Sequence, residues 1–163
     1  YLQCARVLMD PARAERLAQA LVAKLPTDVR DRIDAVVSPA MGGVIIGHEM
    51  GRALGKPAVF LERPQGVFEL RRGFRLDPGS KVLMVEDVVT TGLSSREAMK
   101  AIEEAGGEVI AAAALVDRAR DDLSGRSIPA QGVDRDAGQG YGAGVRSGSI
   151  SRPLYVWHVG QTR

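Results

Sequence analysis

The stretch that decides the fold is VLMVEDVVTTGLS, residues 82–94 of a 163-residue chain. It begins with an apolar run over 82–85, which is too short for a buried helix and has the length typical of a buried strand. Glu86 and Asp87 follow, so we expect two adjacent carboxylates at the end of that strand. In open α/β sheets, ligands bind at the carboxyl ends of the strands. The stretch therefore predicts an acidic ligand site at one edge of a sheet.

The second half of the stretch predicts a turn and the start of a helix. Thr90, Thr91 and Gly92 make a small turn that is rich in hydroxyl groups. Ser94 and Glu97 have the S-x-x-E spacing of a capping box, in which the serine begins the helix. Because a helix N-terminus presents free N–H groups to an anion, we expect a phosphate to bind there. The carboxylates can accept hydrogen bonds from a diol, and the turn beside them can hold a phosphate. This combination favours a sugar phosphate as the ligand.

The order of these pieces resembles the signature of the type I phosphoribosyltransferases. In that signature an apolar run precedes two acids, two apolar residues and a Thr-Thr-Gly or Thr-Ala-Gly turn, as residues 82–92 do here. Each piece alone is also typical of a buried strand, a capped helix or a solvated acidic pair, but the full order favours the functional interpretation. The resemblance implies a parallel sheet flanked by helices, with a small hood over a site for phosphoribosyl diphosphate.

Length and composition are those of a single ordinary domain. A chain of this length buries roughly two-thirds of its unfolded surface. The net charge of +2 gives no indication of nucleic-acid or membrane binding, and the longest apolar run, 109–116, is too short to cross a bilayer. Cys4 is the single cysteine, which excludes an internal disulfide and is expected to be a packing residue. With no secretory leader at Tyr1 we expect a cytoplasmic protein, and the missing initial methionine indicates a fragment or a processed start.

Helices and strands are predicted to alternate along the first 118 residues. Asp10 and Pro11 are a typical helix start, with an acidic N-cap and a proline in the first turn. Gly55 is a typical helix end. Such alternation predicts a parallel, doubly wound sheet. The expected helices cover 11–26, 44–54 and 94–105, and the expected strands cover 35–37, 58–61, 82–85 and 108–116, with a charged loop or hairpin over 62–77.

The last part of the chain has a different composition, in which Gly, Ser, Asp and Arg dominate. Its glycines do not have the spacing of a dinucleotide-binding fingerprint. We therefore divide the chain into a phosphoribosyltransferase-like core over 1–119 and an atypical tail over 120–163, with one last strand expected over 154–159. A shifted reading frame or a truncated gene is one hypothesis for the origin of the tail.

Three further stretches resemble the orotate phosphoribosyltransferases, a family within this group. They are SPAMGGVIIGHEMGRALGKP at 38–57, FLERPQGVFELRRGF at 60–74 and ALVDRA at 114–119. The purine phosphoribosyltransferases share the signature but not the E-R…L-R-R-G-F pattern. The resemblance implies transfer of a phosphoribosyl group from phosphoribosyl diphosphate to orotate. The products are orotidine 5-monophosphate and diphosphate, in a step of pyrimidine synthesis.

The same resemblance implies roles for individual residues. Glu86 and Asp87 would hold the ribose hydroxyls, with Asp87 as a catalytic proton acceptor, and Arg63 would be the catalytic cation at the diphosphate. Thr90 and Arg118 would hold orotate, since a guanidinium suits its carboxylate. The implied contacts to phosphoribosyl diphosphate come from Glu86, Asp87, Val88, Val89, Thr90, Thr91, Gly92, Leu93, Ser94, Met41, Gly42, Arg63, Arg71 and Arg72.

A cofactor and a partner are implied as well. Mg²⁺ would bridge diphosphate and sugar oxygens and lower the cost of the leaving charge, held mainly through the diphosphate rather than by protein ligands. The turn at 40–43 would lie against the diphosphate, where glycines let the backbone approach closely. In relatives the loop that corresponds to 63–73 reaches the site of a second subunit, so a homodimer is implied.

The chain departs from the family pattern in that loop and at its ends. Many relatives carry lysine in the loop and in the diphosphate turn, whereas this chain has no lysine over 63–73 and has Gly42 in the turn. Relatives carry a further segment before the equivalent of Tyr1, so we expect the hood to be largely missing. Two alternatives stay open: a non-catalytic regulator that senses phosphoribosyl diphosphate, and a purine phosphoribosyltransferase.

Overall fold

A computed structural model describes residues 4–118, 133–134 and 155–159. The boundary expected at 119 and most of the tail lie outside the described residues. The helices are α1 Cys4–Leu8, α2 Pro11–Val22, α3 Thr27–Arg30, α4 Gly43–Leu54 and α5 Leu93–Glu104. The strands are β1 Ala35–Pro39, β2 Ala58–Glu62, β3 Glu69–Leu70, β4 Lys81–Val89, β5 Glu108–Asp117, β6 Val133–Asp134 and β7 Tyr155–Val159.

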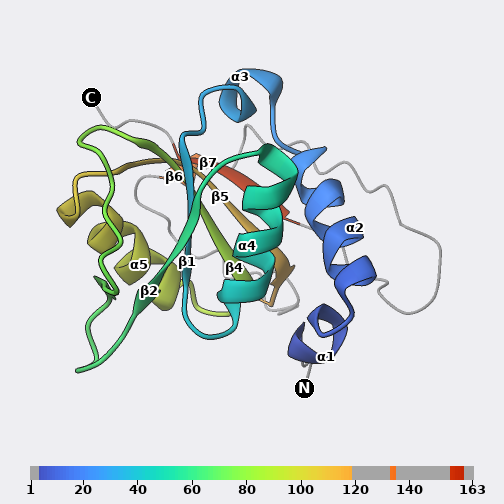
Figure 1. The fold of residues 1–163 in the computed structure, drawn as a ribbon, viewed down its shortest axis with the longest axis horizontal. Coiled ribbons are helices and arrows are strands. Elements are labelled where there is room, and N and C mark those ends of the chain that lie inside the picture. The colour runs from blue at the N-terminus through green and yellow to red at the C-terminus, as the bar shows by residue number, and fades with distance from the viewer. Residues whose placement is uncertain (1–3, 119–132, 135–154, 160–163) are drawn as a thin grey trace.

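All the strands belong to one sheet, in the order β3-β2-β1-β4-β5-β7-β6 (Figure 1). The four central strands, β2, β1, β4 and β5, are parallel, as the alternation of helices and strands predicts. Antiparallel strands extend both edges, so the sheet is mixed rather than wholly parallel. At one edge the charged segment after β2 folds back as a hairpin through β3. At the other, β7 lies within the range 154–159 and pairs with β5.

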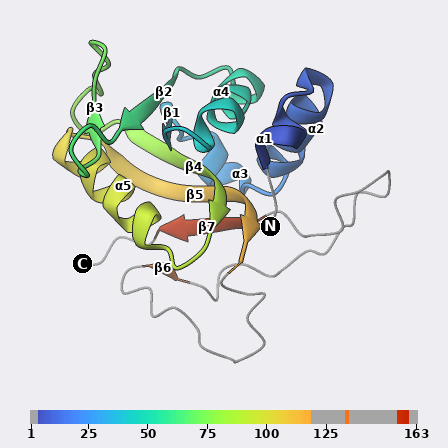
Figure 2. The same ribbon diagram turned by 90° about the horizontal axis from the view of Figure 1, so that it is seen from below.

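Helices cover both faces of the sheet, and two separate hydrophobic clusters result. Successive side chains of a strand point to opposite faces. Leu83 and Val85 of β4 pack with α1, α2 and α4, whereas Val82 and Met84 pack with α5 on the other face. Figure 2 shows α5 on the side of the sheet opposite to α1, α2 and α4. The sheet is therefore doubly wound, as the sequence predicts.

Two details of the stretch 82–94 differ from the sequence-based predictions. First, β4 continues through Val89, so the acidic pair lies inside the strand rather than at its end. Pairing with the longer strand β5 carries the ladder beyond the apolar run. Second, α5 begins at Leu93, and its N-cap is Gly92, which has a left-handed φ of 73° and no side chain to cap the helix. Ser94 is therefore inside the helix, and the predicted capping box is wrong.

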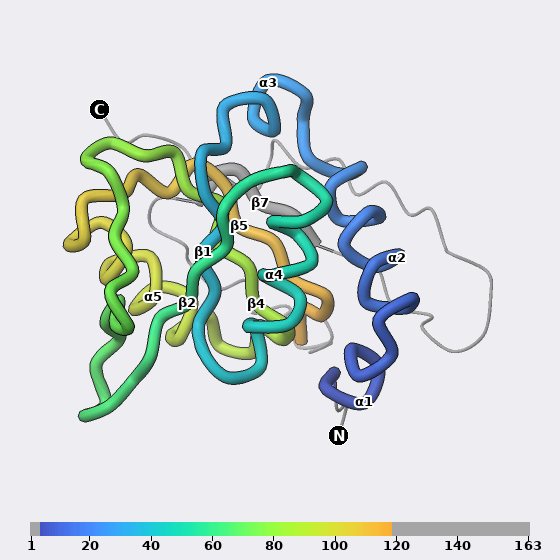
Figure 3. The backbone as a smooth tube through the Cα atoms, viewed as in Figure 1, coloured from blue at the N-terminus to red at the C-terminus, as the bar shows by residue number. Residues whose placement is uncertain are grey.

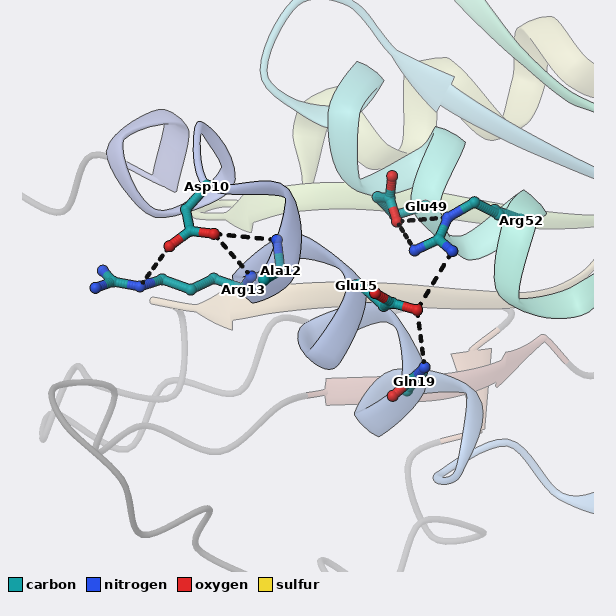
Figure 4. Close-up of polar contacts among 7 residues, drawn as sticks. All are labelled: Asp10, Ala12, Arg13, Glu15, Gln19, Glu49 and Arg52. Carbon is teal, nitrogen blue, oxygen red and sulfur yellow. Dashed lines mark hydrogen bonds and ion pairs between the residues drawn. The ribbon is translucent and has the colours of Figure 1, made fainter.

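The predicted ends of the other helices are closer to the structure. The carboxylate of Asp10 accepts hydrogen bonds from the backbone N–H groups of Ala12 and Arg13, at 3.0 and 3.3 Å (Figure 4). Gly55 ends α4 with a left-handed φ of 65°. Helix α2 ends at Val22 rather than near residue 26. The N–H groups of Lys24 and Leu25 donate to carbonyls three residues earlier in the chain, so the α-helical pattern of hydrogen bonds stops there. Among the described residues, no helix combines the length and apolar character needed to cross a membrane.

The N-cap of α2 yields the first testable prediction. Asp10→Ala leaves the two N–H groups of the first turn without their side-chain acceptor. We expect the free energy of unfolding to fall by about 1 kcal/mol, measured by urea denaturation. Asp31→Ala is the control, since Asp31 makes only an exposed ion pair with Arg30, and a loss below about 0.5 kcal/mol is expected. Equal losses in the two variants would contradict the capping role.

An ion-pair network links α2 to α4 on the outside of the molecule (Figure 4). Arg52 of α4 donates to Glu49 Oε2 at 2.6 Å and to Glu15 Oε1 of α2 at 3.3 Å. Gln19 also donates to Glu15, at 3.3 Å. These groups are mostly exposed, so the network contributes little to stability. Arg52 lies in the last turn of α4, which makes it a useful reference arginine outside the candidate site.

Candidate functional site

The candidate site forms where the carboxyl ends of the central strands meet. The turn after β1 leads into α4, the turn after β4 leads into α5, and Arg118 follows β5. Both turns lie at the lower end of the sheet in Figures 1 and 3. The backbone N–H of Arg118 donates to the carbonyl of Val89 at 2.8 Å, which brings the ends of β4 and β5 together. The turn after β1, the acidic pair, the hydroxyl-rich turn and Arg118 are thus neighbours at one edge of the sheet.

The two acids point to opposite faces of β4, and Asp87 faces the turn before α4. A Cβ atom added to Gly42 would lie 2.5 Å from Oδ2 and 2.6 Å from Oδ1 of Asp87. A side chain at position 42 would therefore require the carboxylate of Asp87 to move. Asp87 Oδ1 also accepts a hydrogen bond from the N–H of Val88 at 2.9 Å. The carboxylate of Asp87 is therefore close to the turn that is predicted to lie against the diphosphate.

Glu86 faces α5 and is 5% exposed. The hydroxyl of Ser95, itself 8% exposed, donates a hydrogen bond to Glu86 Oε2. Burial raises the pKa of Glu86 above its ordinary value, and nearby Asp87 acts in the same direction. The Ser95 and Ser94 hydroxyls and the charge of Arg63 lower the pKa of Glu86. The ionised form of Glu86 thus depends on these donors.

Cys4 contacts the backbone of the acidic pair from the core of the protein. It is the first residue of α1 and is buried in the core shared with α2 and α4, as its predicted packing role requires. Its Sγ donates to the backbone carbonyl of Asp87, at 3.9 Å. Burial, with a smaller effect of Asp87, raises the pKa of the Cys4 thiol to about 11. The thiol is therefore protonated at neutral pH and is not a nucleophile.

Arg63 reaches the site from the segment that follows β2. Its guanidinium forms an ion pair with Glu97 of α5 at 2.6 Å and lies 3.9 Å from the ring centre of Phe68. It remains partly exposed, and its charge acts on Glu86. Arg63 therefore lies on the α5 side of the acidic pair. Glu97, predicted to cap the helix, instead holds this arginine.

The other two arginines of the loop gather around Glu62 at the end of β2. Arg72 donates to Glu62 Oε1 at 2.6 Å, and Arg71 is 3.7 Å from Oε2. Both arginine side chains are more than half exposed. Arg72 has a left-handed φ of 59°, an unusual backbone for a residue with a side chain. The structure does not bring Arg71 and Arg72 into contact with the acidic pair.

The turn after β4 is open to solvent. Thr90, Thr91 and Ser94 are exposed, and the hydroxyl of Thr91 accepts from the N–H of Leu93 at 3.3 Å. Val89 is buried, so its side chain is part of the core and only its backbone is available to a ligand. Exposed hydroxyls and the free N–H groups of the first turn of α5 can together accept an anion. Val88 and Gly92 are half-buried and Leu93 is exposed, and none of their side chains brings a charge to the turn.

The turn after β1 is similarly accessible. Met41 is 85% exposed and Gly42 is exposed, whereas Gly43 is buried against the carbonyl of Val85. The peptide bond between Ala40 and Met41 is cis. The N–H of Ala40 donates to the carbonyl of Leu61 at 2.8 Å, which ties the turn to β2. The backbone of this turn is therefore fixed on one side and open on the other.

A hollow of about 300 Å³ lies elsewhere, between α4 and β2. Its lining is mostly apolar and includes Ile45, His48 and Phe60. Neither carboxylate of the acidic pair lines it. The candidate site is thus an open edge, identified by its chemistry rather than by a deep cavity. Among the described residues, no group of three or more His, Cys, Asp or Glu side chains could hold a metal ion.

The match to known proteins agrees with this geometry. A model of the phosphoribosyl transferase domain matches residues 8–137, which include the acidic pair, both turns and Arg118. The chain belongs to the phosphoribosyl transferase domain family. The family assignment confirms the resemblance from which the site residues were predicted.

Named relatives of this phosphoribosyl transferase chain are the orotate phosphoribosyltransferases of Novosphingobium aromaticivorans and Sphingopyxis alaskensis. They are 80% and 79% identical over 118 residues, or 72% of this chain. The chain spans only 61% and 60% of their lengths. The structure of orotate phosphoribosyltransferase from Aeropyrum pernix is 26% identical, with a TM-score of 0.60 over 72% of this chain and 67% of that one. The type I fold is therefore established.

Sequence reasoning missed Ser95 and Glu97 as partners of site residues. A usable signal exists for Ser95, which shares the buried face of α5 with Ala98 and Ile102 at helical spacing. A hydroxyl on an apolar helix face needs a buried partner. No comparable signal exists for Glu97, because its partner Arg63 lies 34 residues away in the sequence.

Proposed function

We propose that this chain is an orotate phosphoribosyltransferase, which joins N1 of orotate to the ribose of phosphoribosyl diphosphate and releases diphosphate. The observation that carries the proposal is the 79–80% identity to orotate phosphoribosyltransferases. The geometry adds support, because the acids, an anion-accepting turn and Arg118 meet at one edge of the sheet. A purine substrate or a purely regulatory role has no comparable support.

The proposed mechanism relies on positioning and charge. Asp87 and Glu86 accept hydrogen bonds from the ribose hydroxyls, and the turn 90–94 holds the 5-phosphate with its hydroxyls and N–H groups. Arg63 stabilises the charge that develops on the departing diphosphate. Because the reacting carbon becomes cation-like as diphosphate leaves, carboxylates nearby lower the barrier as well as orient the sugar. Asp87 also accepts a proton if orotate arrives with its N–H intact.

Mg²⁺ is the proposed cofactor. Hard oxygen donors suit this ion, and the oxygens of diphosphate are donors of this kind. We propose that most of its ligands are diphosphate and sugar oxygens. When bound, the ion neutralises part of the charge of the leaving group.

Two further proposals concern assembly and location. The exposed loop with Arg71 and Arg72 is proposed to reach the site of a second copy, so that the working form is a homodimer. A single cysteine that is free and buried supports a cytoplasmic location. Light scattering of the purified chain, with and without phosphoribosyl diphosphate, tests the dimer.

The reaction itself is tested by mixing the chain with Mg²⁺, phosphoribosyl diphosphate and orotate. Loss of orotate absorbance is expected, with diphosphate formed in equal amount. The same assay with adenine, guanine, hypoxanthine or uracil is expected to give no product. Turnover of a purine would replace the proposal with a purine phosphoribosyltransferase. Binding of phosphoribosyl diphosphate without any turnover would favour a sensor.

Arg118→Ala gives a prediction specific to orotate. Loss of a charge-assisted hydrogen bond to the orotate carboxylate is expected to raise the KM for orotate by about tenfold, because such bonds contribute about 1.5–3 kcal/mol. The Kd of phosphoribosyl diphosphate is expected to change little. Steady-state kinetics with orotate varied, and calorimetry with phosphoribosyl diphosphate, separate the two effects. An unchanged KM for orotate would remove Arg118 from the orotate site.

A further inference from the structure

We propose that Ser95 is a positioning residue for the ribose site, because its buried hydroxyl donates to Glu86 and fixes the orientation of that carboxylate. The inference rests on the proposed function and extends it to a residue outside the signature stretch 82–94. It concerns a residue that lies in α5, one position beyond the turn that accepts the phosphate.

Burial makes the Ser95 contact specific. Ser95 and Glu86 are 8% and 5% exposed, so bulk water competes little for the hydrogen bond between them. On β5 the register partner of Glu86 is Ala114, which brings no charge. Within hydrogen-bonding reach, the hydroxyls of α5 are the donors that can hold the Glu86 carboxylate in one orientation.

The contact leaves Glu86 able to serve a sugar. An ionised carboxylate offers about four acceptor positions, and one hydrogen bond from Ser95 uses a single one of them. The remaining positions can accept from ribose hydroxyls without further reorientation. Pre-orientation of a binding group reduces the entropy lost when the ligand binds. Removal of the Ser95 hydroxyl should therefore weaken ground-state binding more than it slows the chemical step.

The charged groups around Glu86 predict a change in pH dependence. Asp87 on β4 disfavours the ionised form, Arg63 from the loop after β2 favours it, and the Ser95 hydroxyl favours it more than Arg63 does. When Ser95 becomes alanine, burial and Asp87 are opposed only by Ser94 and Arg63. The pKa of Glu86 then rises further, so protonation inactivates the ribose site at a higher pH than in the wild type.

The test compares Ser95→Ala with the wild type across a pH series. We expect the KM for phosphoribosyl diphosphate to rise about tenfold with kcat changed less than threefold, since one hydrogen bond to a charged group is lost. The acidic limb of kcat/KM should move to higher pH. Ser95→Thr, which keeps the hydroxyl, should retain the wild-type pH profile. Ser80→Ala is the control, because the Ser80 hydroxyl donates to the carbonyl of Asp77 in the loop before β4, away from the site.

A measurement without substrate separates this inference from the proposed function. Carbon-13 NMR of the Glu86 carboxyl in the unliganded chain should give a higher pKa in Ser95→Ala than in the wild type or Ser80→Ala. A wild type that binds and converts substrate, with Ser95→Ala unchanged in pH profile and in NMR titration, overturns the role of Ser95 alone. A wild type that neither binds phosphoribosyl diphosphate nor consumes orotate overturns the proposed function and the ribose role with it. The NMR result then reports only whether Ser95 controls Glu86.

Discussion

Arg63→Ala is expected to lower kcat by about 100- to 1,000-fold, the usual cost of removing one preorganised donor to a developing negative charge. The charge of Arg63 acts on Glu86, whereas Arg71 and Arg72 form ion pairs with Glu62. The orotate assay with saturating substrates gives kcat directly. Calorimetric binding of phosphoribosyl diphosphate shows whether the loss also affects the ground state.

The expected effect of Arg63→Ala on stability is small by comparison. The ion pair with Glu97 is partly exposed, and such pairs contribute about 0–1 kcal/mol. The contact with the Phe68 ring adds about 0.5–1 kcal/mol at an exposed site. We therefore expect the free energy of unfolding to fall by no more than about 2 kcal/mol. The variant should stay folded at the assay temperature, so lost turnover cannot be ascribed to unfolding.

Arg52→Ala is the matched control for Arg63→Ala. It also removes an arginine from a partly exposed ion pair, but in the last turn of α4 with Glu49 and Glu15 as partners (Figure 4). We expect unchanged kinetics and a similarly small loss of stability. If Arg63→Ala retained wild-type kcat, the diphosphate would have to be stabilised by another cation, and the assignment of Arg63 would be abandoned.

The parts of the fold that sequence predicts best depend on neighbours in the chain. The apolar runs that became β1, β4 and β5 and the proline, aspartate and glycine signals around α2 and α4 act within a few residues. The acidic pair and the turn 90–94 were found in the same way, because the whole signature lies in one continuous stretch. Local signals therefore suffice for the central sheet, and they also predict where the candidate site lies.

The remaining features depend on contacts between distant segments. Strand β4 extends to Val89 because β5 continues beside it, and no property of the apolar run predicts that extension. Glu97 loses its capping role because Gly92 starts the helix early and Arg63 lies close enough to pair with it. The antiparallel pairing of β7 with β5 likewise joins strands that lie far apart in the sequence. Such contacts need three-dimensional coordinates.

Gly42→Ala is expected to lower kcat/KM for phosphoribosyl diphosphate by about 100-fold while leaving the protein folded. The added Cβ would lie 2.5 Å from Asp87 Oδ2, so the carboxylate must move, and its hydrogen bond from the N–H of Val88 would be strained. A displacement of about 1 Å in a binding group can cost about 100-fold in rate. The backbone itself accepts alanine, because φ and ψ at Gly42 are −58° and −40°. Since only the end of a side chain must shift, we expect a stability change within about 1 kcal/mol.

Gly107→Ala is expected to lower stability and to leave kcat/KM unchanged. Comparison of the two variants therefore distinguishes a steric clash at the candidate site from a steric clash in the core. A Cβ at Gly107 would lie 2.9 Å from Ile102 Cγ2 and from Leu76 Cδ1, inside the apolar packing around α5. Overpacking there should lower the free energy of unfolding by about 1–3 kcal/mol, measured by urea denaturation, with kcat/KM unchanged below the melting range. Gly42→Ala should show the reverse pattern. If both variants lost stability alike and kept wild-type kcat/KM, the close approach of the turn to Asp87 would have no part in substrate binding.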